Sequence, residues 1–247
     1  MRRRAFLAGL AASTPFGASA RTIISNAEAL SGDRFAVDGA EFILADILAP
    51  PLYTLADEAP AYFEASRRAL QSAMAGAVEI EDVLPATRWG GRIIQARRSG
   101  AQETLQENAV AAGAARVGPQ SGDHVFIRRL LELEAEARAA RRGLWALEDY
   151  RIFDAANAWG AVGGFHLVEG TVVRAAQFGG RFYLNFGEDY RTDFTAGATL
   201  ALYPRWAKAG DDLAAYENAG IRVRGLVEPI NGPSLDLKHP LQIERLN

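Results

Sequence analysis

The 247-residue chain contains no cysteine, which excludes disulfide bonds, thiolate zinc sites and cysteine nucleophiles together. Its three histidines, His124, His166 and His239, are too few for a histidine-rich metal site. After the first twenty residues no apolar run approaches the roughly 18 residues of a membrane span, so we expect no transmembrane segment in the mature chain. An excess of basic residues is also missing, because 27 lysines and arginines face 30 aspartates and glutamates. The formal net charge of −3 gives no reason to expect bulk-charge coating of nucleic acid.

The composition is that of a globular protein, with 49% hydrophobic and 23% charged residues, which rules out a disordered or collagen-like chain. A chain of 247 residues suggests one large or two modest domains. Residues 31–150 show strand patterns and then three helical stretches, the last beginning at the N-cap Asp123 and ending at Gly143. Strand patterns predominate over 160–247, and the join at 150–164 is either a linker or a packed connection. We predict a mostly β chain with helices, of the α+β class, with domains at 31–150 and 160–247.

The first 20 residues have the order of an export signal. Basic residues including Arg3 and Arg4 precede a short apolar run, and Ala18 and Ala20 form an A-x-A cleavage pattern. The double arginine is similar to a twin-arginine signal, which carries folded cargo across a membrane. We therefore predict a signal peptide over 1–20 and an exported, periplasmic protein; the alternative is a frayed N-terminal helix. Removing three arginines and no acidic residue lowers the formal net charge from −3 to −6.

Turn signals and element order predict the architecture of the second block. Asn231-Gly232 predicts a tight hairpin turn, as does Asp38-Gly39 in the first block. The second block has the order strand–strand–strand–helix–strand–strand, which is typical of a small five-stranded Greek-key barrel. We therefore expect a C-terminal OB-type barrel.

Four stretches of the first block resemble the staphylococcal-nuclease (thermonuclease) family. They are S-G-D-R-F at 31–35, L-A-D-I-L-A-P at 44–50, L-Q-E-N-A-V-A-A-G-A-A-R-V at 105–117 and E-A-E-A-R-A-A-R-R-G-L-W at 134–145. The last two are the specific ones, and all four occur in the family's order. The resemblance covers roughly half of the chain and implies a five-stranded OB-type barrel with three helices, so that the whole chain would hold two such barrels.

The resemblance also implies a chemistry. Family members cleave phosphodiesters with a calcium ion held by carboxylates, a glutamate base and two arginines on the phosphate. The first calcium aspartate corresponds to Asp33. The other positions hold different residue types: Ser31 for the neighbouring aspartate, Leu48 for the second metal aspartate, Ile43 for one arginine and Pro51 for the base.

Two further residues leave room for a shifted site. The second arginine falls on Gly91 without a gap and on Arg92 with a one-residue insertion, so Arg92 is the candidate catalytic residue. Asp46 lies two residues from Leu48, on the same strand face, and joins Asp33 as a candidate calcium ligand. Because calcium takes six to eight oxygen ligands, so few carboxylates predict loss of hydrolysis.

Five residues are candidate contacts to nucleic acid or another phosphate polymer: Arg88, Trp89, Tyr183, Arg222 and Arg224. An exposed indole suits stacking on a base, and arginines beside it suit phosphate. The tyrosine belongs to a stretch in which aromatic and charged residues are interleaved, and the last two arginines alternate with apolar residues as a basic stripe. For each residue the alternative is a packing aromatic or a solvated arginine.

The resulting interpretation is an exported thermonuclease-like pseudoenzyme that binds single-stranded nucleic acid, another phosphate polymer or an envelope protein. The alternative is a calcium-dependent phosphodiesterase that uses Asp33, Asp46 and Arg92 in a shifted active site. A third class is a structural envelope-associated protein. Metal dependence separates the first two, and salt-sensitive affinity for single strands separates the first from the third.

Overall fold

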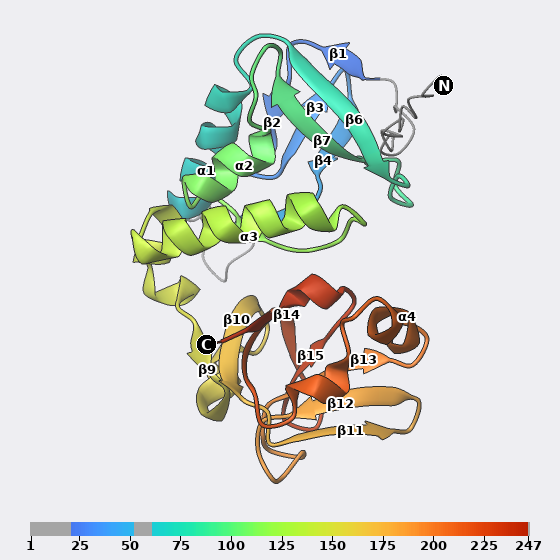
Figure 1. Cartoon of the computed structure of the whole chain (residues 1–247). Coiled ribbons are helices and arrows are strands. Elements are labelled where there is room, and N and C mark those ends of the chain that lie inside the picture. The colour runs from blue at the N-terminus through green and yellow to red at the C-terminus, as the bar shows by residue number, and fades with distance from the viewer. Residues whose placement is uncertain (1–20, 52–60, 247) are drawn as a thin grey trace, which may run out of the picture.

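The computed structural model describes residues 21–51 and 61–246 (Figure 1). The predicted signal peptide, with Arg3, Arg4, Ala18 and Ala20, lies outside the described residues. The described chain is of the α+β class, with mostly strands and few helices. Within those two ranges, no helix has the length and apolar character to cross a membrane.

The N-terminal half, residues 21–150, contains a six-stranded sheet of order β1-β6-β7-β4-β3-β2. Its strands are β1 (Thr22–Ile24), β2 (Glu28–Ala29), β3 (Arg34–Val37), β4 (Ala40–Leu44), β6 (Val78–Leu84) and β7 (Arg92–Arg98). A separate pair joins β5 (Ile47–Leu48) to β8 (Arg116–Val117). Asp38 and Gly39 both have positive φ, 49° and 81°, so the predicted tight turn between β3 and β4 is confirmed.

Three α-helices accompany this sheet: α1 (Ala61–Ala73), α2 (Leu105–Ala111) and α3 (His124–Ala139). The predicted N-cap of α3 is confirmed, because the Asp123 carboxylate accepts a hydrogen bond from the Phe126 amide at 3.0 Å. The predicted end of this helix is wrong. The first left-handed residue after the helix is Arg141, with a φ of 51°. Gly143, two residues later, is also left-handed, with a φ of 53°, and an added Cβ there would lie 2.4 Å from the Gly113 oxygen.

The C-terminal half, residues 151–246, contains an eight-stranded sheet of order β11-β12-β13-β15-β14-β10-β9, with β16 paired to β14. Its strands are β9 (Phe153–Asp154), β10 (Phe165–Thr171), β11 (Arg174–Phe178), β12 (Arg181–Asn185), β13 (Thr195–Thr199), β14 (Gly220–Pro229), β15 (Pro233–Asp236) and β16 (Ile243–Arg245). Its one α-helix is α4 (Tyr203–Lys208). Five 3₁₀ segments complete the described elements of the chain: Gly143–Ala146, Glu148–Tyr150, Ala155–Ala161, Leu213–Tyr216 and Pro240–Gln242.

The two sheets follow the same path. Three strands form an antiparallel meander, β2-β3-β4 in one half and β11-β12-β13 in the other. A helix follows, and the next two strands return so that β7 lies parallel to β4, and β15 parallel to β13. The first strand of each path is split into two pieces that pair at opposite sides of the sheet, β1 and β2 or β10 and β11.

This splitting explains why the N-terminal sheet has six strands rather than the five predicted for the block. The C-terminal sheet has eight because, besides its split first strand, β9 pairs with β10 and β16 pairs with β14. Only residues 25–27 separate β1 from β2, and residues 172–173 separate β10 from β11. In the part of the chain that the structure describes, no hydrogen-bonded strand pairing closes either sheet.

Each half has its own hydrophobic core, with Phe35 and Ile94 among the buried residues of the first and Leu184 and Phe194 among those of the second. The join after residue 150 is a packed connection, because Phe153, like most alanines of the Ala155–Ala161 segment, belongs to the second core. Helix α3 lies between the N-terminal sheet and the C-terminal half (Figure 1). The domain boundaries themselves stay a prediction.

Candidate functional site

Asp33, the candidate calcium ligand that precedes β3, serves the local fold. Its Oδ1 accepts a hydrogen bond from the Ser31 hydroxyl at 2.6 Å, and its Oδ2 accepts one from the Ala49 amide at 3.1 Å. The side chain is buried. These bonds tie the start of β3 to the segment after β5, so the carboxylate has a structural role already.

Asp46 is fully buried in the turn between β4 and β5, where its φ is 63°. Its Oδ1 accepts hydrogen bonds from the amides of Gln120 and Ser121, at 2.7 and 2.8 Å. Its Oδ2 is buried without a hydrogen-bond partner among the described residues. The carboxylate therefore holds the loop that leads into α3.

The two aspartates do not combine into a calcium site. They bind different backbone segments, and in residues 21–51 and 61–246 no group of three or more histidine, aspartate or glutamate side chains has metal-holding geometry. Leu48, at the position of the second metal aspartate, pairs in β5 with Arg116, whose guanidinium is buried. A buried cation beside this position disfavours a divalent ion, and the donor set does not fit calcium.

Arg92, the candidate catalytic residue at the start of β7, is held by Asp82 of β6. The Arg92 Nε lies 2.9 Å from Asp82 Oδ1, and its Nη2 lies 2.6 Å from Oδ2. The hydrogen bond to this carboxylate raises the pKa of Arg92 above its ordinary value. Asp82 thus occupies one of the two edges with which an arginine can clamp a phosphate.

Arg88 and Trp89 lie in the turn between β6 and β7. The Trp89 side chain is 79% exposed, and the Arg88 guanidinium lies 4.3 Å from the centre of its ring. Thr87 fixes this turn, because its backbone exchanges hydrogen bonds with Gly91 and Gly90 and its hydroxyl accepts from the Gly91 amide. The turn therefore presents an aromatic ring to solvent on a defined backbone.

Tyr183 lies on the outer face of β12, between the buried residues Phe182 and Leu184. Its ring packs over Gly197 of β13, where an added Cβ would lie 3.0 Å from a ring carbon. The guanidinium of Arg181 lies 5.9 Å from the ring centre. The structure thus places Tyr183 on a partly exposed face, in the other half of the molecule from Trp89.

The predicted basic stripe of β14 does not face solvent. Arg224 is 0% exposed; its Nη1 donates to Glu134 Oε2 at 2.8 Å, and it also pairs with Glu244. Arg222 binds Glu169 at 2.8 Å and is mostly buried. The interpretation of Arg224 as a polymer contact is corrected, because α3 covers this side of β14 and no polymer reaches the guanidinium.

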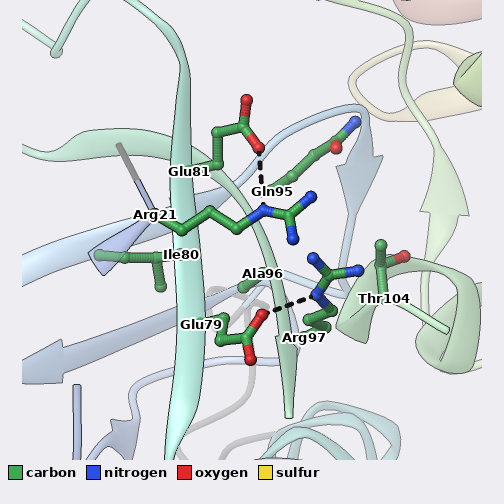
Figure 2. Close-up of a pocket in the computed structure, with 8 residues that line it drawn as sticks. All are labelled: Arg21, Glu79, Ile80, Glu81, Gln95, Ala96, Arg97 and Thr104. Carbon is green, nitrogen blue, oxygen red and sulfur yellow. Dashed lines mark hydrogen bonds and ion pairs between the residues drawn. The ribbon is translucent and has the colours of Figure 1, made fainter. Parts of the chain in front are cut away.

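Sequence reasoning missed a pocket of about 70 Å³ on the N-terminal half (Figure 2). It is lined by Arg21, Glu79, Ile80, Glu81, Gln95, Ala96, Arg97 and Thr104. The alternation of charged and apolar residues in β6 and β7 was the available signal. Arg21, which completes the pocket, precedes the predicted first domain, and nothing in the sequence indicated that it would lie there.

No family model matches the chain, and no curated protein matches it. The resemblance to the thermonuclease family therefore stays a prediction.

Proposed function

We propose that the protein is a thermonuclease-like pseudoenzyme that binds single-stranded nucleic acid or another phosphate polymer. The observation that carries this proposal is the turn between β6 and β7, where Trp89 is 79% exposed beside the Arg88 guanidinium. A ring that is open to solvent stacks on bases of any sequence, and an adjacent arginine supplies a phosphate contact.

The strand path supports two OB-type barrels. In each half, one piece of the first strand pairs with the second strand and the other piece pairs with the fourth. The fifth strand lies parallel to the third. This path agrees with the proposal of five-stranded Greek-key barrels. In OB folds the loop between the last two strands contributes to oligonucleotide binding. The turn that carries Trp89 joins β6 and β7, the fourth and fifth strands of this path in the N-terminal half.

The engaged side chains support loss of hydrolysis. Asp33 and Asp46 accept backbone hydrogen bonds, and Asp82 engages Nε and Nη2 of Arg92. Removing a single electrostatic element of an active site commonly costs about 10²–10³ in rate. The alternative phosphodiesterase would have to release all three side chains from these contacts before any of them reached a substrate.

Binding of a fluorescently labelled oligothymidylate, followed by anisotropy, tests the proposal. We expect Trp89→Ala to weaken binding by about 1–3 kcal/mol, the usual contribution of one stacked base. Trp159→Ala is the matched control, because it removes an exposed tryptophan from the other half of the chain. Affinity should also fall as salt rises, since phosphate contacts release counterions.

Two results would count against this function. The first is no measurable binding of oligothymidylate or inorganic polyphosphate at low salt. The second is binding that both tryptophan variants weaken equally, which would show that the turn has no specific part in it.

A further inference from the structure

The pocket in Figure 2 lies at the open end of the β6–β7 hairpin, away from the turn that carries Trp89. Glu79 stands opposite Arg97 in the strand register, and Glu81 stands opposite Gln95. Arg21 precedes β1, which pairs with β6. Side chains from β6, β7 and the residue before β1 therefore meet over Ala96.

The two guanidinium groups of this pocket point toward each other (Figure 2). The Nε of Arg97 donates to Glu79 at 3.0 Å, and the Nε of Arg21 lies 3.8 Å from Glu81. Both carboxylates thus approach the inner nitrogen of their arginine. Within the described part of the chain, no hydrogen bond engages the Nη atoms of Arg21 or Arg97.

Glu79 is held in its charged state. The hydrogen bonds from Arg97 and Ser99 lower its pKa below the ordinary value, so it keeps the Arg97 Nε engaged. The Nη groups of the two arginines are left as converging donors of like charge. Such an arrangement is favourable when an anion lies between them, because each guanidinium matches two oxygens of an oxyanion.

The size of the pocket restricts the ligand. Its volume of about 70 Å³ suits a small group, and two guanidinium groups line it. We propose that this pocket binds a single phosphate-type oxyanion between Arg21 and Arg97. This site is separate from the Trp89 surface, and it requires that processing after Ala20 leave Arg21 on the chain.

Titration of the purified protein with inorganic phosphate, followed by NMR of the arginine Nε–H signals, tests the site. N-terminal sequencing first establishes which residue begins the chain. We expect saturable shifts of the Arg21 and Arg97 signals at millimolar phosphate. Arg97→Gln should weaken binding about tenfold or more, as expected for the loss of charge-assisted hydrogen bonds.

The control is Arg67→Gln, which removes an arginine that is also paired with a glutamate, Glu64, but on α1. It should leave phosphate binding unchanged, and so should Trp89→Ala. Glu79→Gln should strengthen binding, because it removes a competing negative charge. If Arg97→Gln does not fold, Arg21→Gln gives the same test at the start of the described chain.

The source of the anion is decided by a second pair of titrations, with oligothymidylate that carries or lacks a 5′-phosphate. A terminal phosphate should shift the same two arginine signals if the site takes a chain end, and only inorganic phosphate should shift them if it takes the free ion. No saturable shift with any of these probes, or an equal loss of binding in Arg67→Gln, would overturn the proposal while leaving Trp89-dependent binding untouched.

Discussion

The two halves share one strand path but differ in the helices that accompany it. The N-terminal half adds α-helices of 13, 7 and 16 residues, whereas the C-terminal half has one α-helix of 6 residues and short 3₁₀ segments. Both use turns with positive φ, at Asp38-Gly39 in one and Asn231-Gly232 in the other. The path therefore depends on strands and turns. The helices add residues to the core, and α3 also provides a surface against which the other half packs.

A group of buried charges crosses the surface between the halves. The N-terminal half contributes the buried Glu134, and the C-terminal half contributes the buried Arg224 and its second partner Glu244. Burial lowers the pKa of Arg224, but the charges of both carboxylates outweigh it and raise the pKa above its ordinary value. Removing one member of such a group leaves an uncompensated charge in the interior.

The largest effect is expected from Glu134→Gln. The change leaves Arg224 buried without one of its two carboxylate partners, and we expect a loss of about 3–5 kcal/mol in the free energy of unfolding, measured in urea. Glu64→Gln is the control, because it breaks a more exposed ion pair on α1 and should cost under about 1 kcal/mol. Equal losses in the two variants would show that the buried group does not join the halves.

A second prediction concerns how the stability of the protein changes at acidic pH. Burial, with the charges of Arg116 and Arg151, lowers the pKa of His166 on β10 from 6.5 to about 4. The folded protein therefore binds fewer protons than the unfolded chain between these values, and its stability falls as the pH drops from 6.5 to about 4. Burial and the nearby His124 also lower the pKa of His239, which adds to the loss in the same direction.

His166→Gln should lose about 1–2 kcal/mol less of the free energy of unfolding over this pH drop than the original protein does. This figure is reduced for the partial solvent screening of the ring. Urea unfolding at pH 7 and pH 4.5 measures it. If the variant and the original protein lose the same free energy of unfolding between these pH values, the pH dependence does not come from His166.

The smallest effect is expected at Arg116, which sharpens the contrast with Arg224. Arg116 is also buried at the junction, but it forms no ion pair with any described residue, and burial lowers its pKa. Its guanidinium lies 4.7 and 5.1 Å from the ring centres of Tyr150 and Phe165, and it donates to the Phe165 carbonyl. Arg116→Met should change stability by less than about 1 kcal/mol or increase it, because no carboxylate is left unpaired. A loss as large as that of Glu134→Gln would contradict this interpretation.

Local features of the fold could be predicted from the sequence, and features that depend on docking could not. The Asp38-Gly39 turn and the Asp123 N-cap follow from short-range backbone preferences. The alternation in β14 correctly indicates a strand with one apolar face. It does not indicate that α3 covers the other face, because the partner of Arg224 lies 90 residues away along the chain.

The candidate site divides in the same way. Exposure of Trp89 agrees with its position beside the Gly90-Gly91 turn, which the sequence shows. The engagement of Arg92 by Asp82 is different, because it depends on the register of β6 against β7, where a shift occurs after Asp82. A single sequence does not specify that register shift, nor the approach of Arg21 to the same hairpin.

A cleavage assay tests whether this protein binds nucleic acid without hydrolysing it. Single- and double-stranded DNA and RNA are incubated with the protein and calcium, magnesium or EDTA, beside the variants Asp33→Ala and Arg92→Ala. We expect no cleavage above background with any metal, under conditions in which the protein still binds oligothymidylate. Calcium-dependent cleavage that both substitutions abolish would contradict it and would establish a rebuilt active site.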